Sequence, residues 1–342
     1  MEKSKVLLIY TGGTIGMIED PKTGVLIPFD FEHLHQQIPE LSRINAQLSV
    51  ESLSESLDSS DMHPNNWKEM AMIIEKNYNS FDGFVILHGT DTMAYTASAL
   101  SFMLQGIKKP VILTGSQLPV GTIRTDGKEN LITSIEIAAC KDQKGESIIQ
   151  EVAVYFEYSL YRGNRTTKVS ANAFEAFLSP NYRELAVAGI DIDYHVDAFL
   201  RTSLSTPCFR YEMDEKVALM KIYPGFSVKV YQELFDVNLV DAVVIESFGA
   251  GNIPNSSDLH KMIENYIQAG GIVINITQCY SGKVAQGKYA NSVKLKELGV
   301  ISGSDLTTEA AITKIMFLLG NYSDKEQIKT LMQHALVGEM TL

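Results

Sequence analysis

Three segments of this chain repeat one construction, an apolar run that stops at glycine and hydroxyl residues. They are KVLLIYTGGTIGM at residues 5–17, FVILHGTDT at 84–92 and PVILTGSQ at 110–117. An unbroken apolar run is typical of a strand that is buried on both faces of a parallel sheet. Open α/β sheets place their ligands at the carboxyl ends of such strands. We therefore expect the three turns to meet in one site that is rich in hydroxyl groups.

The remaining pattern alternates strands with helices. Strand-like runs occur at residues 46–57, 152–156, 218–222, 242–245 and 272–276, and helical patterns at 65–78, 93–104, 129–139, 256–268 and 307–319. This alternation predicts an α/β fold with parallel sheets. The chain has 342 residues, a length that suggests roughly two domains. We place an amino-terminal α/β domain with the site at residues 1–194, a linker at 195–214 and a smaller parallel-sheet α/β domain at 215–342.

Composition excludes several classes of function. The formal net charge is −12, with basic and acidic residues interspersed, which argues against nucleic acid or an anionic membrane as the main partner. Three widely spaced cysteines form neither a disulfide framework nor a zinc motif. The apolar run at residues 6–10 is shorter than that of a signal peptide, and no segment approaches the roughly 20 apolar residues of a membrane span. These features predict a reduced, cytoplasmic protein.

Several polar residues that follow the strands have two interpretations. In DSSDM at residues 58–62, one side chain can cap the helix that follows, but four small polar groups at a strand end also suit a binding loop. Asp91 or Thr92 can likewise cap the helix at 93–104. The basic segment YRGNRTTK at 161–168 resembles an ordinary solvated face, yet it ends in a lysine beside an apolar stretch. The sequence leaves these alternatives open.

The motifs indicate hydrolysis more than nucleotide chemistry. TGGTIG lacks the G-x-G-x-x-G spacing of dinucleotide sites, and the sequence contains no P-loop, G-x-S-x-G or H-E-x-x-H motif. A threonine hydroxyl needs a neighbouring base to attack a carbonyl. A buried lysine beside a carboxylate can supply that base, because desolvation lowers its pKa. The residues therefore suit amide or ester hydrolysis of a small charged molecule, without a metal or cofactor.

The motifs, taken together, resemble those of bacterial type I, cytoplasmic L-asparaginases. The matching segments run in the family's order over nearly the full chain: TGGTIGM at 11–17, DSSDM at 58–62, DGFVILHGTDTMAYTASALSFML at 82–104, TGSQLP at 114–119, LYRGNRTTK at 160–168, GAGNIP at 249–254 and TQCYSGKV at 277–284. The resemblance implies a larger amino-terminal and a smaller carboxyl-terminal α/β domain. It also implies a homo-oligomer, either a homodimer or a homotetramer built as a dimer of dimers.

The resemblance further assigns catalytic roles. Thr14 matches the nucleophile that attacks the side-chain amide of L-asparagine, giving a β-aspartyl-enzyme and ammonia before water releases L-aspartate. Thr90, Asp91 and Lys168 match a second catalytic group that handles the proton or the water. Which threonine attacks first has been argued within the family. Such a two-step acyl transfer with a positioned base is physically sensible.

The resemblance also implies how the substrate is held. Asp91 would bind the substrate ammonium, and Ser59 and Ser60 would receive its α-carboxylate. The backbone at Gly115 would contact the reacting amide. Asn252, in GAGNIP, is a candidate to cross a subunit interface toward the partner's site. The glutamate that type II enzymes donate from a neighbouring subunit has no match here.

One departure from the family concerns the loop expected at residues 19–30, which precedes a short helix expected at 31–38. Many members place a tyrosine after a glycine in this loop, where it hydrogen-bonds the nucleophilic threonine. In this chain Gly24 is followed by Val-Leu-Ile, so that tyrosine is missing. Either another residue reaches Thr14 or the threonine is activated differently.

A second departure concerns regulation. Type I enzymes can carry a separate asparagine pocket, and Thr167 and Cys279 match its positions. Glu246 stands where enteric relatives have an arginine suited to the effector's carboxylate. This reversal of charge opposes carboxylate binding, so we expect weak or absent activation by asparagine.

Two other functions compete with asparagine hydrolysis. A relative of the same fold can act on glutamine, as a glutaminase or as the subunit that releases ammonia for tRNA-dependent amidation; the latter usually carries an extension before TGGT, where this chain has ten residues. A non-catalytic amino-acid sensor would be expected to lose Thr14, Thr90 or Lys168. All three are present, which favours an enzyme.

Overall fold

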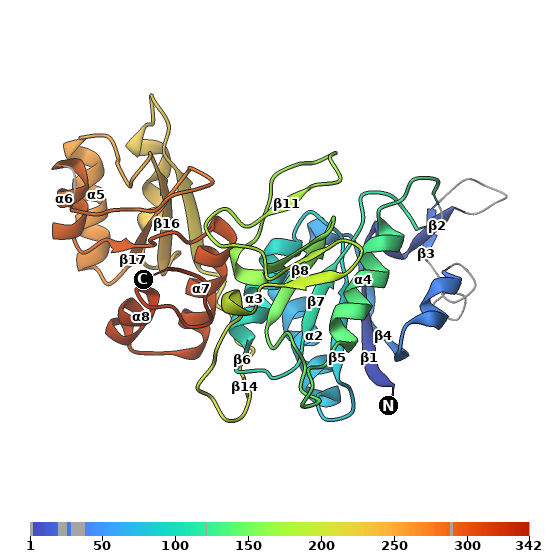
Figure 1. Ribbon diagram of the computed structural model, residues 1–342. Coiled ribbons are helices and arrows are strands. Elements are labelled where there is room, and N and C mark those ends of the chain that lie inside the picture. Colours follow the sequence, from blue (N-terminus) through green and yellow to red (C-terminus); the bar gives the residue numbers. More distant parts are fainter. Residues whose placement is uncertain (1–2, 20–25, 29–37, 121, 288–289, 342) are drawn as a thin grey trace. The chain divides into compact units, whose positions relative to one another are not determined.

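The computed structural model describes residues 3–19, 26–28, 38–120, 122–287 and 290–341 (Figure 1). The chain divides into two compact units, Met1–Tyr211 and Glu212–Leu342. Each unit holds a sheet with helices packed on it, so the predicted two-domain α/β fold is confirmed. Within the described ranges, no helix has the length and apolar character needed to cross a membrane.

The first unit is built on an eight-stranded sheet in the order β13-β12-β9-β8-β7-β5-β1-β4. Its parallel part consists of β4 (Ala46–Leu57), β1 (Ser4–Gly12), β5 (Gly83–Leu87), β7 (Val111–Thr114) and β8 (Val152–Phe156). Every residue of β5, β7 and β8 is buried. The apolar runs are therefore central strands, as their composition predicted.

The far end of this sheet is antiparallel, and here the prediction of a purely parallel sheet is wrong. β9 (Ser159–Arg162), β12 (Ala186–Ala188) and β13 (Ile192–Tyr194) all pair antiparallel with their neighbours. Only two residues, Glu157 and Tyr158, join β8 to β9, and both have positive φ, 43° and 67°. Such a tight turn matches the twist of a hairpin, and a two-residue connection can join only antiparallel strands.

Among the described residues of the first unit, three α-helices pack on its sheet. They are α2 (Pro64–Asn77), α3 (Met93–Met103) and α4 (Gly127–Ala139), each within two residues of its predicted bounds. Leu131 and Ile135 of α4 belong to one apolar cluster with Val6, Leu8 and Val85 of the sheet. α4 therefore packs directly on the strands whose carboxyl ends carry the glycine-rich turns.

Short elements complete the first unit. Two-stranded pairs are formed by β2 (Met17–Glu19) with β3 (Leu26–Pro28), β10 (Thr167–Lys168) with β11 (Phe177–Leu178), and β6 (Leu104–Gln105) with β14 (Cys208–Phe209). Single-turn 3-10 helices are η1 (Thr14–Gly16), η3 (Pro39–Arg43), η4 (Ser59–Asp61), η5 (Gly163–Arg165) and η6 (Val196–Ala198). The backbone of residues 17–19 and 26–28 pairs as a hairpin where we expected a loop. Residues 24 and 25, and all of the helix expected at 31–38 except Ile38, lie outside the described residues.

The second unit holds a four-stranded parallel sheet in the order β15-β16-β17-β18. Its strands are β15 (Val217–Lys221), β16 (Ala242–Ser247), β17 (Ile272–Thr277) and β18 (Ile301–Ser302). Its helices are α5 (Ser257–Gln268), α6 (Ala290–Glu297), α7 (Thr308–Asn321), α8 (Lys325–Met332) and the 3-10 helix η7 (Val228–Phe235). The strands predicted at 218–222, 242–245 and 272–276 and the helices predicted at 256–268 and 307–319 are confirmed here, whereas α8 follows α7 without an intervening strand.

A buried ion pair anchors the carboxyl-terminal segment within the second unit. Lys314 Nζ of α7 lies 2.7 Å from Glu339 Oε1, and both side chains are fully buried. The ammonium also donates to the carbonyls of Met332 (3.2 Å) and His334 (2.7 Å). The carboxylate accepts the backbone N–H groups of residues 336 and 337. Because both charges are fully hydrogen-bonded, the pair avoids the cost of an unpaired buried charge.

Candidate active site

The turns after β1 and β5 touch each other at two glycines. Gly13 has a φ of 82°, and a Cβ built on it would lie 2.6 Å from Gly89 Cα. No residue with a side chain fits at such a separation, and positive φ favours glycine as well. Thr14 follows Gly13 and Thr90 follows Gly89, so this contact brings the two candidate threonines to the same edge of the sheet.

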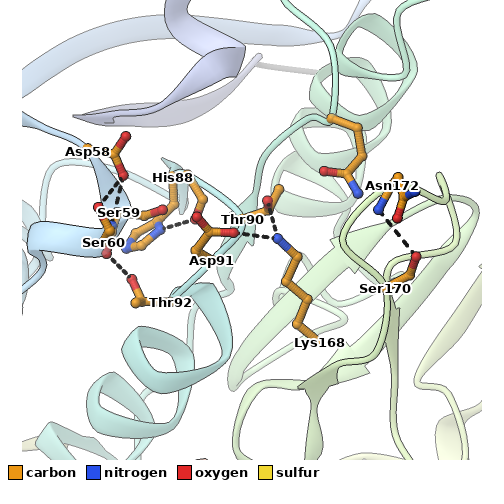
Figure 2. A network of polar contacts seen from close by, with 12 residues as sticks. Asp58, Ser59, Ser60, His88, Thr90, Asp91, Thr92, Lys168, Ser170 and Asn172 are labelled. Carbon is orange, nitrogen blue, oxygen red and sulfur yellow. Dashed lines mark hydrogen bonds and ion pairs between the residues drawn. The ribbon is translucent and has the colours of Figure 1, made fainter.

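The turn after β4 contacts the turn after β5. A Cβ on Gly89 would lie 2.6 Å from Ser59 Oγ, and Thr92 Oγ1 donates to the carbonyl of Ser59 at 2.6 Å. Asp58 caps η4, because its carboxylate accepts from the backbone N–H and the hydroxyl of Ser60, each at 2.8 Å. Figure 2 shows these side chains beside His88, Asp91 and Thr92. Ser59 is buried, whereas Ser60 is exposed.

The capping interpretation of DSSDM is wrong for helix α2. His63 is the N-cap of α2. Its ring nitrogen Nδ1 accepts from the backbone N–H of Asn65 at 3.3 Å, and its backbone N–H donates to Asn66 Oδ1 at 2.9 Å. Ser59 and Ser60 are therefore not needed to begin α2. Their role as carboxylate ligands stays a prediction.

Lys168 joins Thr90 to Asp91. Its Nζ donates to Thr90 Oγ1 at 2.8 Å and to Asp91 Oδ1 at 2.6 Å, as Figure 2 shows. The lysine side chain is 17% exposed and the Asp91 side chain 65%. Lys168 is thus held at the site by two polar partners and does not belong to a solvated basic face. Thr92 is the N-cap residue of α3 but makes no side-chain capping bond, so the capping interpretation also fails for Asp91 and Thr92.

Thr14 lies in η1 and is partly buried. Its hydroxyl makes no hydrogen bond to any residue that the structure describes, and so no substitute for the missing tyrosine is identified there. Thr11 differs: its buried hydroxyl donates to the carbonyl of Leu87 at 3.0 Å and ties β1 to β5. Thr11 is therefore structural, and Thr14 keeps a hydroxyl that is available to a substrate.

A chain of buried hydrogen bonds that the sequence did not predict ends at Gly89, the residue before Thr90. Trp67 Nε1 donates to Thr96 Oγ1 at 2.9 Å, Thr96 Oγ1 contacts His88 Nε2 at 2.9 Å, and His88 Nδ1 contacts the carbonyl of Gly89 at 2.6 Å. The Gly89 carbonyl can only accept, so the proton of the neutral His88 ring resides on Nδ1 and the Thr96 hydroxyl donates to Nε2. Burial lowers the pKa of His88 to about 4, which keeps the ring neutral.

His88 should make the fold sensitive to acid. Because its folded-state pKa lies below the ordinary value of 6.5, the unfolded chain binds a proton that the native chain does not, and stability falls as the pH drops from 6.5 toward 4. Near pH 5 the loss should be about 2 kcal/mol. Urea unfolding at about pH 7 and about pH 5 would measure it, with His88→Gln as the control that lacks this component. Equal acid sensitivity in both proteins would contradict the assignment.

The turn after β7 is also held by residues that the sequence analysis missed. Asp126 accepts from the backbone N–H groups of Gln117 (2.8 Å) and Leu118 (3.1 Å), and Asn130 Nδ2 donates to the carbonyl of Gly115 at 3.1 Å. Asp126 is 6% exposed and Asn130 is fully buried. Gly115 lies beside Thr90, since a Cβ built on it would be 3.4 Å from Thr90 Cγ2. A polar residue within a helical pattern gives no sign in sequence that it reaches such a turn.

The remaining predicted site residues lie in different units. Thr167 precedes Lys168 in β10 of the first unit, whereas Glu246, Asn252 and Cys279 belong to the second. Glu246 is buried in β16, and its carboxylate accepts from Thr308 Oγ1 at 2.6 Å and lies 3.3 Å from Lys221 Nζ. Cys279 is exposed and unpaired in any disulfide. Their roles at an interface or in an effector pocket stay predictions.

No group of three or more histidine, cysteine or acidic side chains suited to a metal ion occurs in the parts of the chain that the structure describes. The cluster at the sheet edge contains hydroxyls, the carboxylates of Asp58 and Asp91, and one lysine. That chemistry suits acyl transfer by a hydroxyl nucleophile.

Comparison with known families covers both units. The model described as "Asparaginase, N-terminal" matches residues 5–199, and that described as "Glutaminase/Asparaginase C-terminal domain" matches residues 216–332. This chain belongs to the asparaginase/glutaminase family. The boundary between the two matches is close to the division between the two compact units.

Individual members of the asparaginase/glutaminase family are similar to nearly all of this chain. L-asparaginase 1 of Escherichia coli K12 is 40% identical over 349 residues, which cover 100% of this chain and 99% of that protein. The crystal structure of L-asparaginase I from Vibrio cholerae has a TM-score of 0.89 at 39% identity, covering 99% of this chain and 100% of that one. A component of the glutamyl-tRNA(Gln) amidotransferase of Pyrococcus horikoshii is 35% identical over 98% of this chain and 76% of its own length.

Proposed function

We propose that this protein is an L-asparaginase that hydrolyses the side-chain amide of L-asparagine to L-aspartate and ammonia. The observation that carries the proposal is the contact of Lys168 with both Thr90 and Asp91, beside the turn that holds Thr14. The full-length similarity to two type I L-asparaginases supports the choice of substrate.

In the proposed first step, Thr14 Oγ bonds to the amide carbon of asparagine, and its hydroxyl proton is transferred to the amide nitrogen. The C–N bond then breaks, and ammonia leaves a β-aspartyl ester on Thr14. In the second step water adds to that ester, its C–O bond to Thr14 breaks, and the threonine regains its proton. Splitting one difficult reaction into two easier ones is the advantage of a covalent intermediate.

In this proposal Thr90 is activated through Lys168 and Asp91 and handles the proton or the water of the reaction. The 2.8 Å contact between Lys168 Nζ and Thr90 Oγ1 is within the reach that proton transfer requires. Asp91 orients the amine through Oδ1. Its other oxygen, on a side chain that is 65% exposed, is available for the substrate ammonium. Ser59, Ser60 and the surrounding backbone receive the α-carboxylate, and the backbone of the turn that contains Gly115 meets the reacting amide.

An ammonia-release assay with L-asparagine, L-glutamine and D-asparagine, each over a range of concentrations, tests the proposal. We expect the highest kcat/KM with L-asparagine and a clearly lower value with L-glutamine. Faster turnover of glutamine would favour the second candidate, a glutamine-directed amidohydrolase, for which the similarity to the amidotransferase component gives a specific reason. Saturable binding of asparagine without ammonia release would instead identify an amino-acid sensor.

We also propose that the enzyme is cytoplasmic and works as a homodimer or homotetramer, with Asn252 close to a partner's site. Analytical ultracentrifugation of the purified chain would measure its size. A monomer with full activity would overturn the part assigned to Asn252.

The same assay should give a hyperbolic rate curve. The Glu246 carboxylate, paired with Lys221 and bonded to Thr308, opposes an effector carboxylate, whereas an arginine would attract it. Glu246, Thr167 and Cys279 match the positions of the effector pocket of type I enzymes. A sigmoidal curve that Thr167→Val abolishes without loss of basal activity would refute the absence of asparagine activation.

A further inference from the structure

The turn of residues 115–118, after β7, is held by the first part of α4 rather than by its own backbone. Three of its backbone groups bond to two side chains: the Gly115 carbonyl to Asn130, and the N–H groups of Gln117 and Leu118 to Asp126. Asp126 and Asn130 also contact each other, at 3.4 Å. A fully satisfied buried network of this kind fixes a single arrangement of the groups it binds.

Neither of these two side chains stabilises helix α4. Asp126 is the N-cap residue of α4, yet its carboxylate caps no N–H of its own helix. A capping carboxylate normally stabilises a helix by about 1 kcal/mol. Asn130 is a poor helix former and is fully buried. Both residues thus serve the neighbouring turn instead of the helix that carries them.

Peptide geometry shows what this anchoring does to Ser116. In a trans peptide the carbonyl of one residue and the N–H of the next point in opposite directions, and the described chain has no cis peptide. Because Asn130 holds the Gly115 carbonyl, the N–H of Ser116 points away from Asn130. Because Asp126 holds the Gln117 N–H, the carbonyl of Ser116 points away from Asp126.

Ser116 is left with unused polar groups in a buried place. The residue is 3% exposed, and its hydroxyl has no hydrogen-bond partner among the described residues. Nor do its backbone N–H and carbonyl bond to any residue within the described ranges. Buried polar groups are rarely left without partners, and the adjoining residue, Gly115, lies against Thr90. The Ser116 side chain lies against Gly127 at the start of α4, so a ligand at the site would complete the bonds of the backbone groups.

We propose that Asp126 and Asn130 are positioning residues of the active site, which aim the backbone of Ser116 at the reacting amide. The inference rests on the proposed function. Neither side chain touches the substrate. Both act through the turn, so their loss should misplace groups that act on the reacting amide and should lower kcat much more than it raises KM.

Asn130→Asp gives a test that a merely structural role would not pass. Its ionised carboxyl cannot donate to Gly115, but its protonated form can, from the position of the lost amide nitrogen. The charged groups that act on the neighbouring Glu157 are Asp126, Glu129 and Glu175, all acidic, and together with burial they raise its pKa to about 7. Glu157 N–H itself donates to Asn130 Oδ1 at 3.1 Å. A carboxyl at position 130 would share this acidic environment, so its pKa should be raised as well.

We expect Asn130→Ala and Asn130→Asp to lower kcat for L-asparagine about 10- to 100-fold at about pH 9, with KM changed by less than about threefold. On lowering the pH to about 6, the ratio of kcat to that of the wild type should rise for Asn130→Asp and stay constant for Asn130→Ala. Asp126→Asn should lower kcat at every pH. The matched control is Glu129→Gln on the same helix, whose carboxylate bonds Tyr155 and Thr133 instead of the turn, and it should keep kcat.

The outcomes separate the two proposals. A wild-type protein that releases no ammonia from asparagine would overturn the proposed function. An active wild type whose Asn130 variants keep full kcat would overturn only the positioning role. A loss of kcat in Asn130→Asp that stays the same between about pH 9 and about pH 6 would do the same. Because Asn130→Asp is compared with itself across pH, this test does not depend on Asn130→Ala folding well.

Discussion

Thr14→Ala and Thr90→Val are each expected to lower kcat for L-asparagine by a factor on the order of 10³ or more, with circular dichroism and thermal unfolding close to those of the wild type. Thr14→Ala removes the proposed nucleophile, whose hydroxyl has no structural bond among the described residues. Thr90→Val keeps the volume of the side chain but removes the oxygen that Lys168 contacts. Steady-state ammonia release under saturating substrate measures both effects.

Thr11→Val is the control for these variants, because Thr11 lies in the same glycine-rich turn. Its buried hydroxyl bonds Leu87, so the change should reduce stability by about 1 kcal/mol and leave kcat nearly unchanged. Full activity in Thr14→Ala would refute the assignment of the nucleophile. An equal loss of activity in Thr11→Val would show that any disturbance of the turn, and not the loss of one hydroxyl, stops turnover.

Lys314→Met should destabilise the protein by roughly 3–5 kcal/mol, because it leaves the fully buried carboxylate of Glu339 without its cation. Urea unfolding, followed by fluorescence and by circular dichroism, would measure the loss. Activity that remains in the folded fraction should be close to that of the wild type.

Lys329→Met is a matched control for this change. Lys329 pairs with Glu326 within α8 at 2.7 Å, but the glutamate is 80% exposed, and exposed pairs of this kind contribute only about 0.5 kcal/mol. The double variant Lys314→Met/Glu339→Leu should recover most of the lost stability, since no charge is then buried unpaired. No recovery in the double variant would mean that packing, not charge, dominates at this position.

The sequence predicted the parallel strands and most helix bounds because apolar periodicity reflects burial directly. It did not predict the antiparallel end of the first sheet. That feature depends on two residues, Glu157 and Tyr158, that adopt a left-handed turn without containing the glycine or asparagine that usually marks one. A two-residue connection without such a signal is easily read as part of a longer strand or loop.

The site was predictable where hydroxyls and glycines follow buried strands, because the carboxyl ends of neighbouring parallel strands lie at the same edge of the sheet. His88, Asp126 and Asn130 were missed for a physical reason. Each bonds a backbone group of a turn, and a buried polar side chain looks the same in sequence as an exposed one. The cap of α2 by His63 was missed in the same way, because histidine is an uncommon cap.

The position of β10 and β11 in the sequence, far from the turns of Thr14 and Thr90, affects the order in which the site is assembled. Thr14 and Thr90 both lie in about the first quarter of the chain. Lys168, which contacts Thr90 and Asp91, follows Thr90 by 78 residues. It belongs to a strand of two residues that pairs with Phe177 and Leu178. Such a non-local contact forms only after the intervening chain has closed its loop. During synthesis, Thr14 and Thr90 would therefore emerge before Lys168, and the contact of Lys168 with Thr90 would be absent until β10 and β11 pair.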